Sequence, residues 1–235
     1  MGGRTVVIAA PGSELLALIT AGGDPAPSEA PTDAVRAAAL IRRRFGLSLP
    51  LPFVGLPGEA EPVRVASATD GPAIAAVKWR ALGTNYRGVL ADDFLDGRDV
   101  VPPPTFWVGR AMVPPTPNHR LFVWGRPGVV YGYLDCGPVH PDDAVPERSD
   151  AGEVYELYVD PVAQGQGGGR QLLAAAEAWF ADRSFAVMEL SVLVGNDVAQ
   201  RFYLDAGWSF TGTVKPVDLG IVAFEEHRLM KVLAP

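Results

Sequence analysis

A glycine-rich segment, QGQGGGR at residues 164–170, is the part of the sequence best suited to bind a charged ligand. It contains four glycines and lies between a predicted strand at 152–160 and a predicted helix at 170–183. The N-terminus of a helix presents unpaired N–H groups and a positive partial charge, and glycines let the backbone approach a ligand closely. The segment therefore favours a phosphate or pyrophosphate ligand. A tight turn between strand and helix is the alternative, and one glycine would satisfy it.

Two common nucleotide-binding patterns do not fit this segment. A Walker loop ends in Gly-Lys-Ser/Thr, which holds the terminal phosphates and Mg²⁺, whereas this segment ends in Gly169, Arg170 and Gln171. The dinucleotide pattern G-x-G-x-x-G fails in both registers, because Arg170 or Leu172 occupies the position of the third glycine. The segment is therefore expected to hold the phosphates of another class of cofactor.

The residues from about 63 onward alternate strand and helix patterns, which indicates an α/β domain with a mixed sheet. Turn residues at 126–128 mark a hairpin between two of the strands. The helix after the glycine segment has one apolar face, formed by Leu172, Leu173, Ala176, Trp179 and Phe180. The predicted strands are 63–67, 120–125, 129–137, 152–160, 186–194, 208–212 and 224–233, and the predicted helices are 69–83, 85–97, 170–183 and 196–207.

Residues 1–60 contain proline-rich segments and lack the alternating strand and helix patterns of the rest, so they are predicted to form an N-terminal extension to a domain at 61–235. Within the extension, a helix is predicted at 32–46, with an N-capping threonine and a terminal glycine. Proline-rich segments before and after this helix are predicted to be extended linkers, because proline disfavours both helix and central strand.

The composition excludes several classes of protein. The formal net charge of −7 disfavours a nucleic-acid partner and suits cationic or amine-bearing small molecules. Cys136 is the single cysteine, so an intramolecular disulfide is excluded and a reducing, cytoplasmic compartment is expected. No apolar run reaches the roughly 20 residues that span a bilayer, so no membrane association is expected. No spacing of His, Cys and Asp suggests a metal site.

The pattern Gln-x-x-Gly-x-Gly at Gln164, Gly167 and Gly169 resembles the pyrophosphate-binding motif of the GNAT superfamily of acetyl-CoA-dependent N-acetyltransferases. The preceding ELYVDP resembles the fourth strand of that family. The later NDVAQRFYLDAGW resembles the family's Asn-x-x-Ala-x-x-Phe-Tyr-x-x-x-Gly-Phe segment, with Trp208 in place of the phenylalanine. The resemblance covers about 63–231 and implies a GNAT-like mixed, mostly antiparallel central sheet flanked by helices, with acetyl-CoA as co-substrate and no metal.

The resemblance also implies roles for individual residues. The backbone of Leu157, Tyr158 and Val159 would pair with the pantetheine arm of coenzyme A. Asn196, which also suits an N-cap, would contact the cofactor or a bound water, and Tyr203 would protonate the departing thiolate. The loop around the pyrophosphate would comprise Gln164, Gly165, Gln166, Gly167, Gly168, Gly169 and Arg170.

A general base is also needed, because an alkylammonium must lose a proton before it attacks a carbonyl. Glu153 and Glu156 lie on the predicted strand at 152–160, and alternation predicts that they face opposite sides of the sheet, so that only one enters the site. The resemblance makes Glu153 the first candidate, since family members often carry a glutamate at this position, and Glu156 is a close second. Either one could act through water, and either could instead be an exposed strand carboxylate. His140 and His227 are other titratable residues and secondary candidates for the base.

Candidate residues for binding the acceptor lie around the first two predicted helices of the domain and on the predicted strand at 129–137. They combine aromatic and acidic groups, which suits a cationic amine: Trp79, Tyr86, Arg87, Asp93 and Asp135. The function that follows is acetyl transfer to a primary amine of a small molecule. The alternatives are a protein N-terminal or lysine acetyltransferase and a non-catalytic acyl-CoA sensor, and a homodimer stays open for each.

Overall fold

The computed structural model of the chain describes residues 5–8, 17–20, 57, 61–96, 101–139, 150–218 and 222–233. In the extension, β1 (Thr5–Ile8) and β2 (Ala17–Thr20) form an antiparallel pair, which the sequence patterns did not predict. The helix predicted at 32–46 lies outside the described residues.

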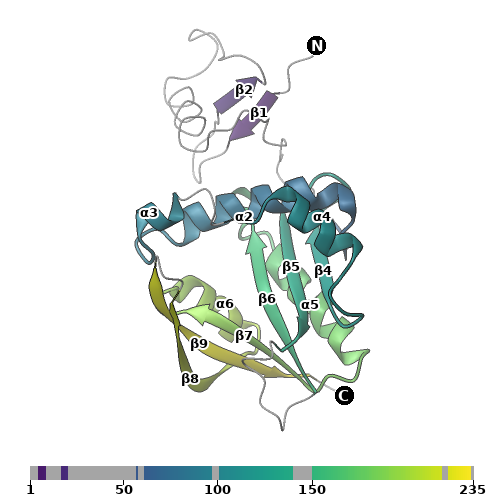
Figure 1. Cartoon of the computed structure of the whole chain (residues 1–235), viewed down its shortest axis with the longest axis vertical. Coiled ribbons are helices and arrows are strands. Elements are labelled where there is room, and N and C mark those ends of the chain that lie inside the picture. The colour runs from purple at the N-terminus through teal and green to yellow at the C-terminus, as the bar shows by residue number, and fades with distance from the viewer. Residues whose placement is uncertain are drawn as a thin grey trace.

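The domain is built on a seven-stranded sheet with the order β3-β4-β5-β6-β7-β9-β8 (Figure 1). β6 and β7 are parallel, and the other neighbouring pairs are antiparallel, which confirms the predicted mixed, mostly antiparallel sheet. The strands are β3 (Val63–Val65), β4 (Arg120–Trp124), β5 (Gly132–Pro138), β6 (Ala151–Val159), β7 (Val187–Leu193), β8 (Ser209–Asp218) and β9 (Ala223–Val232).

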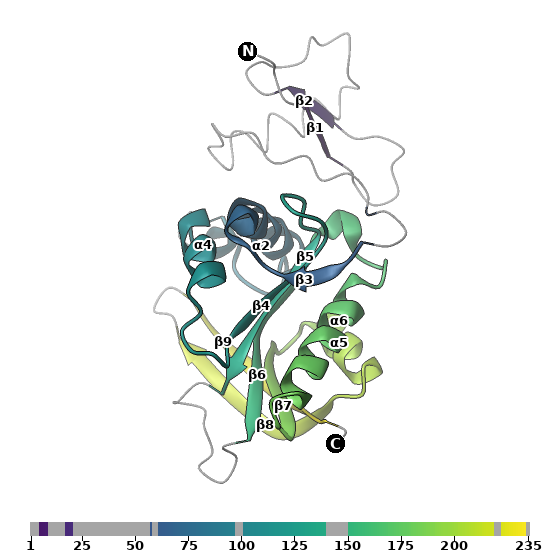
Figure 2. The same cartoon turned by 90° about the vertical axis from the view of Figure 1, so that its right-hand side faces the viewer.

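Helices cover both faces of this sheet (Figure 2). α2 (Gly71–Asn85) and α4 (Pro104–Met112) lie on one face, and α5 (Gly168–Ala181) and α6 (Asp197–Asp205) lie on the other. A short helix, α3 (Asp92–Leu95), follows α2. α4 is a helix that the sequence analysis missed. It begins after a run of prolines, which are tolerated at the first turn of a helix, and it buries Trp107 against α2.

The core has two parts, one on each face of the sheet. The larger part contains the buried side of α5, where Leu172, Leu173, Ala176 and Phe180 are buried as predicted and Trp179 is half-buried. The smaller part joins α2, α4 and the other face of the sheet through Ile74, Val77 and Trp107, among others. Within the described residues no helix has the length and apolar character needed to cross a membrane.

The centre of the sheet is open, because β6 and β7 stay paired only near their first residues. The parallel pairing runs from Ala151 to Glu153 on β6 and from Val187 to Glu189 on β7. Beyond these residues the two strands diverge, and Figure 1 shows β6 rising toward α2 while β7 turns toward β9. The gap that results lies between the C-terminal half of β6 and the C-terminal half of β7, and it holds the candidate site.

Candidate functional site

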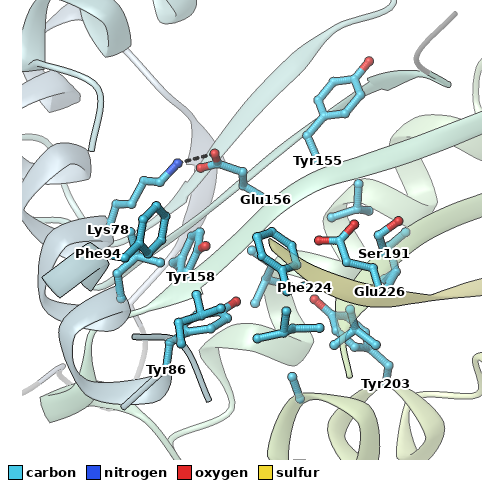
Figure 3. Close-up of a pocket in the computed structure, with 18 residues that line it drawn as sticks. Lys78, Tyr86, Phe94, Tyr155, Glu156, Tyr158, Ser191, Tyr203, Phe224 and Glu226 are labelled. Carbon is cyan, nitrogen blue, oxygen red and sulfur yellow. Dashed lines mark hydrogen bonds and ion pairs between the residues drawn. The ribbon is translucent and has the colours of Figure 1, made fainter. Parts of the chain in front are cut away.

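Two cavities meet in the gap between β6 and β7. The first, which we call the loop cavity, has a volume of about 610 Å³ and is lined by the C-terminal part of β6, residues 163–165 and 167–170, and α6. The second, the strand cavity, has a volume of about 250 Å³ and lies between α2, β6, β7 and β9 (Figure 3). Both cavities are lined by Tyr86, Leu157, Tyr158, Ala199 and Tyr203, so a ligand in one can touch a ligand in the other.

The glycine segment turns the chain from β6 into α5 at the rim of the loop cavity. Gly167 has a φ of 84° and is the N-cap of α5, so this position needs the left-handed conformation that glycine adopts easily. A Cβ atom at Gly168 would lie 2.1 Å from the ring of Trp124, which is buried. The glycines thus meet demands of the turn itself, and they also leave the first N–H groups of α5 at the cavity.

Nearly all residues predicted to hold a cofactor line the loop cavity. They are Leu157, Tyr158, Val159, Gln164, Gly165, Gly167, Gly168, Gly169, Arg170, Asn196 and Tyr203. Gln166 is exposed and is not among the lining residues. The Gln164 side chain donates hydrogen bonds to Asn85 Oδ1 (3.2 Å) and to the carbonyl of Val159 (3.1 Å), so the segment is tied to the end of α2 and to β6.

Two polar residues hold the rest of this cavity in place. Asn196 caps α6 as predicted, because its side chain accepts a hydrogen bond from the N–H of Ala199 at 3.1 Å. Asp160 follows β6 and is fully buried, where Arg80 of α2 donates to Oδ2 at 2.7 Å. α2 is therefore linked by an ion pair and a side-chain hydrogen bond to the segment that carries the glycines.

Tyr203 lies at the junction of the two cavities. It comes from α6, and its ring packs edge-on against Trp208 and Phe202, with centroid separations of 5.8 and 5.1 Å. Burial raises the pKa of its hydroxyl above the usual 10.0, and the neighbouring Tyr86 adds to this effect. The hydroxyl therefore stays protonated at neutral pH and can donate a proton or a hydrogen bond at this point.

The two glutamates face the same side of the sheet, so the prediction from alternation was wrong. β6 has a bulge at Tyr155, because Glu156 is paired with Asp135 while Val154 is paired with the next residue, Cys136. The extra residue reverses the alternation. Val154 and Leu157 consequently share the core on the α5 side, and both glutamates point toward the other side.

Only one of these glutamates lines a cavity. Glu156 lines the strand cavity, where it forms an ion pair with Lys78 and accepts a hydrogen bond from the Tyr133 hydroxyl at 2.5 Å. Glu153 is buried and forms an ion pair with Arg228 of β9 at 2.6 Å, and the same arginine contacts Glu189 at 3.1 Å. Glu153 is among the lining residues of neither cavity.

Of the residues predicted to bind the acceptor, only Tyr86 lines the two cavities. Arg87 pairs with Asp92 at 2.5 Å and also with Asp96, and so joins α2 to α3. Asp135 is buried and pairs with Arg110 of α4 at 2.9 Å, and burial raises the pKa of its carboxyl to about 6 although the guanidinium opposes this. Trp79, Arg87, Asp93 and Asp135 do not line either cavity.

The residues that do line the strand cavity include several that sequence reasoning missed: Lys78, Phe94, Ser191, Phe224 and Glu226. They come from α2, α3, β7 and β9, so only the tertiary fold brings them together (Figure 3). One signal was present in the sequence, since Lys78 interrupts the apolar face of α2 between Ala75 and Leu82. His227 lies on β9 against Phe210 and outside both cavities, and His140 lies outside the described residues.

Residues 90–208 match the model of the acetyltransferase (GNAT) family. The matched range runs from just before α3 through the glycine segment to Trp208, so it contains most of the lining of both cavities. The chain belongs to the GNAT acetyltransferase family. The resemblance drawn from the sequence is therefore confirmed, together with the class of enzyme, an acyltransferase of the N-acetyltransferase type.

One curated relative matches this chain over a short segment. A curated protein from Cellulomonas flavigena, named mycothiol acetyltransferase, is 38% identical over 76 residues, which are 31% of this chain and 22% of that protein. The chain thus matches about a fifth of the length of that relative. Its name describes that protein, and the short match does not extend to this chain's substrate.

Solved structures share the fold of this GNAT domain. An N-acetyltransferase from Staphylococcus aureus Mu50 matches with a TM-score of 0.59 and 17% identity, over 74% of this chain and 99% of its own. A candidate acetyltransferase from Salmonella typhimurium, solved with its cofactor acetyl-CoA, matches with a TM-score of 0.57 and 21% identity, over 74% of this chain and 95% of its own. These likenesses confirm the predicted GNAT-like fold.

Proposed function

We propose that this GNAT family member transfers an acetyl group from acetyl-CoA to a primary amine of a small molecule. The observation that carries the proposal is the meeting of the loop cavity and the strand cavity at Tyr203, with a carboxylate, Glu156, on the lining of the strand cavity. A donor and an acceptor that occupy the two cavities would react at this junction. Residues 61–235 would form the catalytic domain, with 1–60 as a separate extension, and the single cysteine, Cys136, supports a reducing, cytoplasmic setting.

The loop cavity would hold acetyl-CoA. The N–H groups at the start of α5 and the positive end of its dipole suit a pyrophosphate, and Arg170 stands on the same rim. The diverging part of β6 offers the backbone of Leu157, Tyr158 and Val159 to the amides of the pantetheine arm, as an added strand would use it. The related structure from Salmonella typhimurium, which contains acetyl-CoA, supports this assignment.

The chain's own residues would then carry the proton transfers. Glu156 takes a proton from the ammonium, directly or through a water, and the free amine attacks the thioester carbonyl. Backbone N–H groups of β6 stabilise the oxyanion. The nitrogen loses its second proton to solvent as the carbon–sulfur bond breaks, and the thiolate takes a proton from the Tyr203 hydroxyl. Glu156 then releases its proton to solvent, and Tyr203 regains one from solvent. Overall the ammonium loses two protons, of which one ends on the coenzyme A thiol and the other in solvent.

A small acceptor is favoured by the volume of the strand cavity. At about 250 Å³ it lies below the range of roughly 300–1,000 Å³ typical of sites for drug-sized ligands. Acetylation of a protein N-terminus or lysine is the second candidate, because a single side chain or terminus could also enter. Glu153, the other predicted base, is the alternative to Glu156, although its ion pair with Arg228 favours a structural role.

The experiment that tests the proposal is release of free thiol from acetyl-CoA, measured against amino acids, polyamines, aminoglycosides and short peptides, with binding of coenzyme A measured in parallel. Release that depends on a small amine supports the proposal, and release with peptides alone assigns the protein substrate class. Tight binding of acetyl-CoA without release from any amine would indicate a sensor. Absence of binding would refute the assignment of the loop cavity.

A further inference from the structure

A buried lysine forms part of the lining of the strand cavity. Lys78 lies on the face of α2 that packs on the sheet, and its side chain is only 11% exposed. Its ammonium pairs with Glu156 and lies over the rings of Trp107 and Tyr158, at 5.6 and 5.8 Å from their centroids (Figure 3). A lysine is rarely buried unless it is paired, and each contact here helps to keep its charge in the protein.

The contacts of Lys78 leave hydrogen-bonding capacity for a ligand. An ammonium has three N–H donors, and the hydrogen bond to Glu156 uses one of them. The rings of Trp107 and Tyr158 interact favourably with the positive charge but accept no conventional hydrogen bond from it. Among the described residues no second oxygen or nitrogen acceptor is bonded to this ammonium, although the side chain borders the cavity. An acceptor substrate could therefore supply an oxygen to it.

A positive group is unexpected in a site for a plain alkylammonium, because like charges a few ångströms apart repel each other. Charges of both signs are instead spread across this cavity. In Figure 3, Lys78 and Glu156 lie on one side, whereas Ser191, Glu226 and Tyr203 lie on the other. A molecule with a positive and a negative end fits this distribution better than a polycation does.

We propose that the acceptor is an amine that also carries a carboxylate, the chemistry of an amino acid, and that Lys78 binds this carboxylate. The ammonium of the substrate then lies between Glu156, the proposed base, and Glu226, toward the Tyr203 junction. The remaining lining is apolar, with Leu82, Leu90, Phe94 and Phe224 among its members, and suits an apolar side chain. This inference rests on the proposed function, because it names the substrate class of the same site.

The first test compares matched acceptors in assays of the wild-type protein. A panel of α-amino acids is assayed by thiol release, each beside its own amide and its decarboxylated amine, with polyamines as further acceptors. We expect kcat/KM for the best amino acid to exceed that for its amide and its amine by tenfold or more. Equal or faster reaction of the amide or the amine would overturn the inference. Acetylation of polyamines with none of the amino acids would overturn it as well, while leaving the proposed function intact.

The second test removes the lysine charge. Lys78→Met should abolish the preference for the amino acid over its decarboxylated amine, mainly through KM for the amino acid, whereas Lys78→Arg should retain part of it. The matched control is Lys231→Met, which also removes a paired lysine but lies on β9 outside both cavities, and which should keep the wild-type preference. A Lys78→Met protein that stays folded and keeps the full preference overturns the inference. If that variant does not fold, the wild-type comparison still decides.

Discussion

Replacement of Tyr203 by phenylalanine is the sharpest test of the proposed mechanism. The change removes one hydroxyl at the junction of the two cavities and keeps the ring that packs against Trp208 and Phe202. The fold and the affinity for acetyl-CoA should therefore change little. If the hydroxyl protonates the departing thiolate, the loss should fall on kcat.

The expected size of this loss follows from general acid catalysis. A positioned acid contributes about 10²–10⁴-fold to a rate, which corresponds to roughly 3–5 kcal/mol in the activation free energy. Burial raises the pKa of the Tyr203 hydroxyl, so the donor stays protonated throughout the range in which amine substrates lose their proton. The wild-type kcat should therefore show no decline from ionisation of Tyr203 below about pH 10.

The assay is steady-state thiol release with the best acceptor, together with the dissociation constant of acetyl-CoA measured by calorimetry. Tyr131→Phe is the matched control, since Tyr131 is buried in the core beside Trp124 and lines neither cavity. We expect kcat to fall by about a hundredfold or more for Tyr203→Phe and by less than about twofold for the control. An unchanged kcat for Tyr203→Phe would refute the assignment of the acid.

Three further predictions concern other residues of the site and its supports. Glu156→Gln should lower kcat/KM for the amine by about 10²-fold with acetyl-CoA affinity retained, whereas Glu153→Gln should chiefly lower the free energy of unfolding, by about 3 kcal/mol, because it breaks a buried ion pair; the opposite pattern in kinetics and urea unfolding would reverse the two roles. Asp135 has a folded-state pKa of about 6 against an unfolded value of 3.8, so the stability of the wild type relative to Asp135→Asn should fall as pH rises from 4 to 6 and then level off. A constant difference in urea unfolding at these pH values would contradict that pKa. Gly168→Ala should cost about 2 kcal/mol or more by overpacking against a buried indole, seen as a lower thermal midpoint, and a midpoint equal to the wild type would show that the turn can relax.

Much of the fold could be predicted from local patterns. The strand at β6, the helix α5 with its apolar face and the N-cap at Asn196 each follow from residues close together in the chain. α4 was missed because prolines on both sides of 104–112 suggest irregular chain, although proline fits the first turn of a helix. β8 was predicted to end at 212 but continues to Asp218, since its pairing with β9 overrides local propensity.

The candidate site was predictable only where a contiguous motif carries it. The residues proposed to bind the cofactor are concentrated in 157–170 and in α6, so a linear pattern identified them. The strand cavity, proposed to bind the acceptor, is assembled from α2, α3, β6, β7 and β9, and nothing in the spacing of Lys78 and Glu226 shows that they share a cavity. Trp79 and Arg87 were chosen from their types alone, but neither lines a cavity, and Arg87 follows α2 and pairs with Asp92 and Asp96 instead.

The bulge at Tyr155 explains how β6 can place apolar side chains in the core under α5 and both glutamates on the other face of the sheet. With regular alternation, Glu156 and Val154 would share a face and Leu157 would lie opposite them. One of the two glutamates would then enter the apolar core under α5, where an ionised carboxylate without partners is costly. The bulge avoids this conflict, and the Tyr155 side chain secures it through its hydroxyl, which donates to the carbonyl of Pro138.

The position of the bulge also matters for the gap. The bulge lies just after Glu153, where the pairing of β6 with β7 ends. Within two residues, β6 therefore reverses the alternation of its side chains and loses its hydrogen-bonded partner β7. From there on, apolar side chains of β6 hold the strand on the α5 core, and Glu156 faces the strand cavity toward Lys78. Deletion of Tyr155 would place Glu156 directly after Val154, with Val154 still opposite Cys136 and Glu156 still opposite Asp135, so we expect both side chains to keep their sides of the sheet and the strand to stay paired, which urea unfolding of the variant would check.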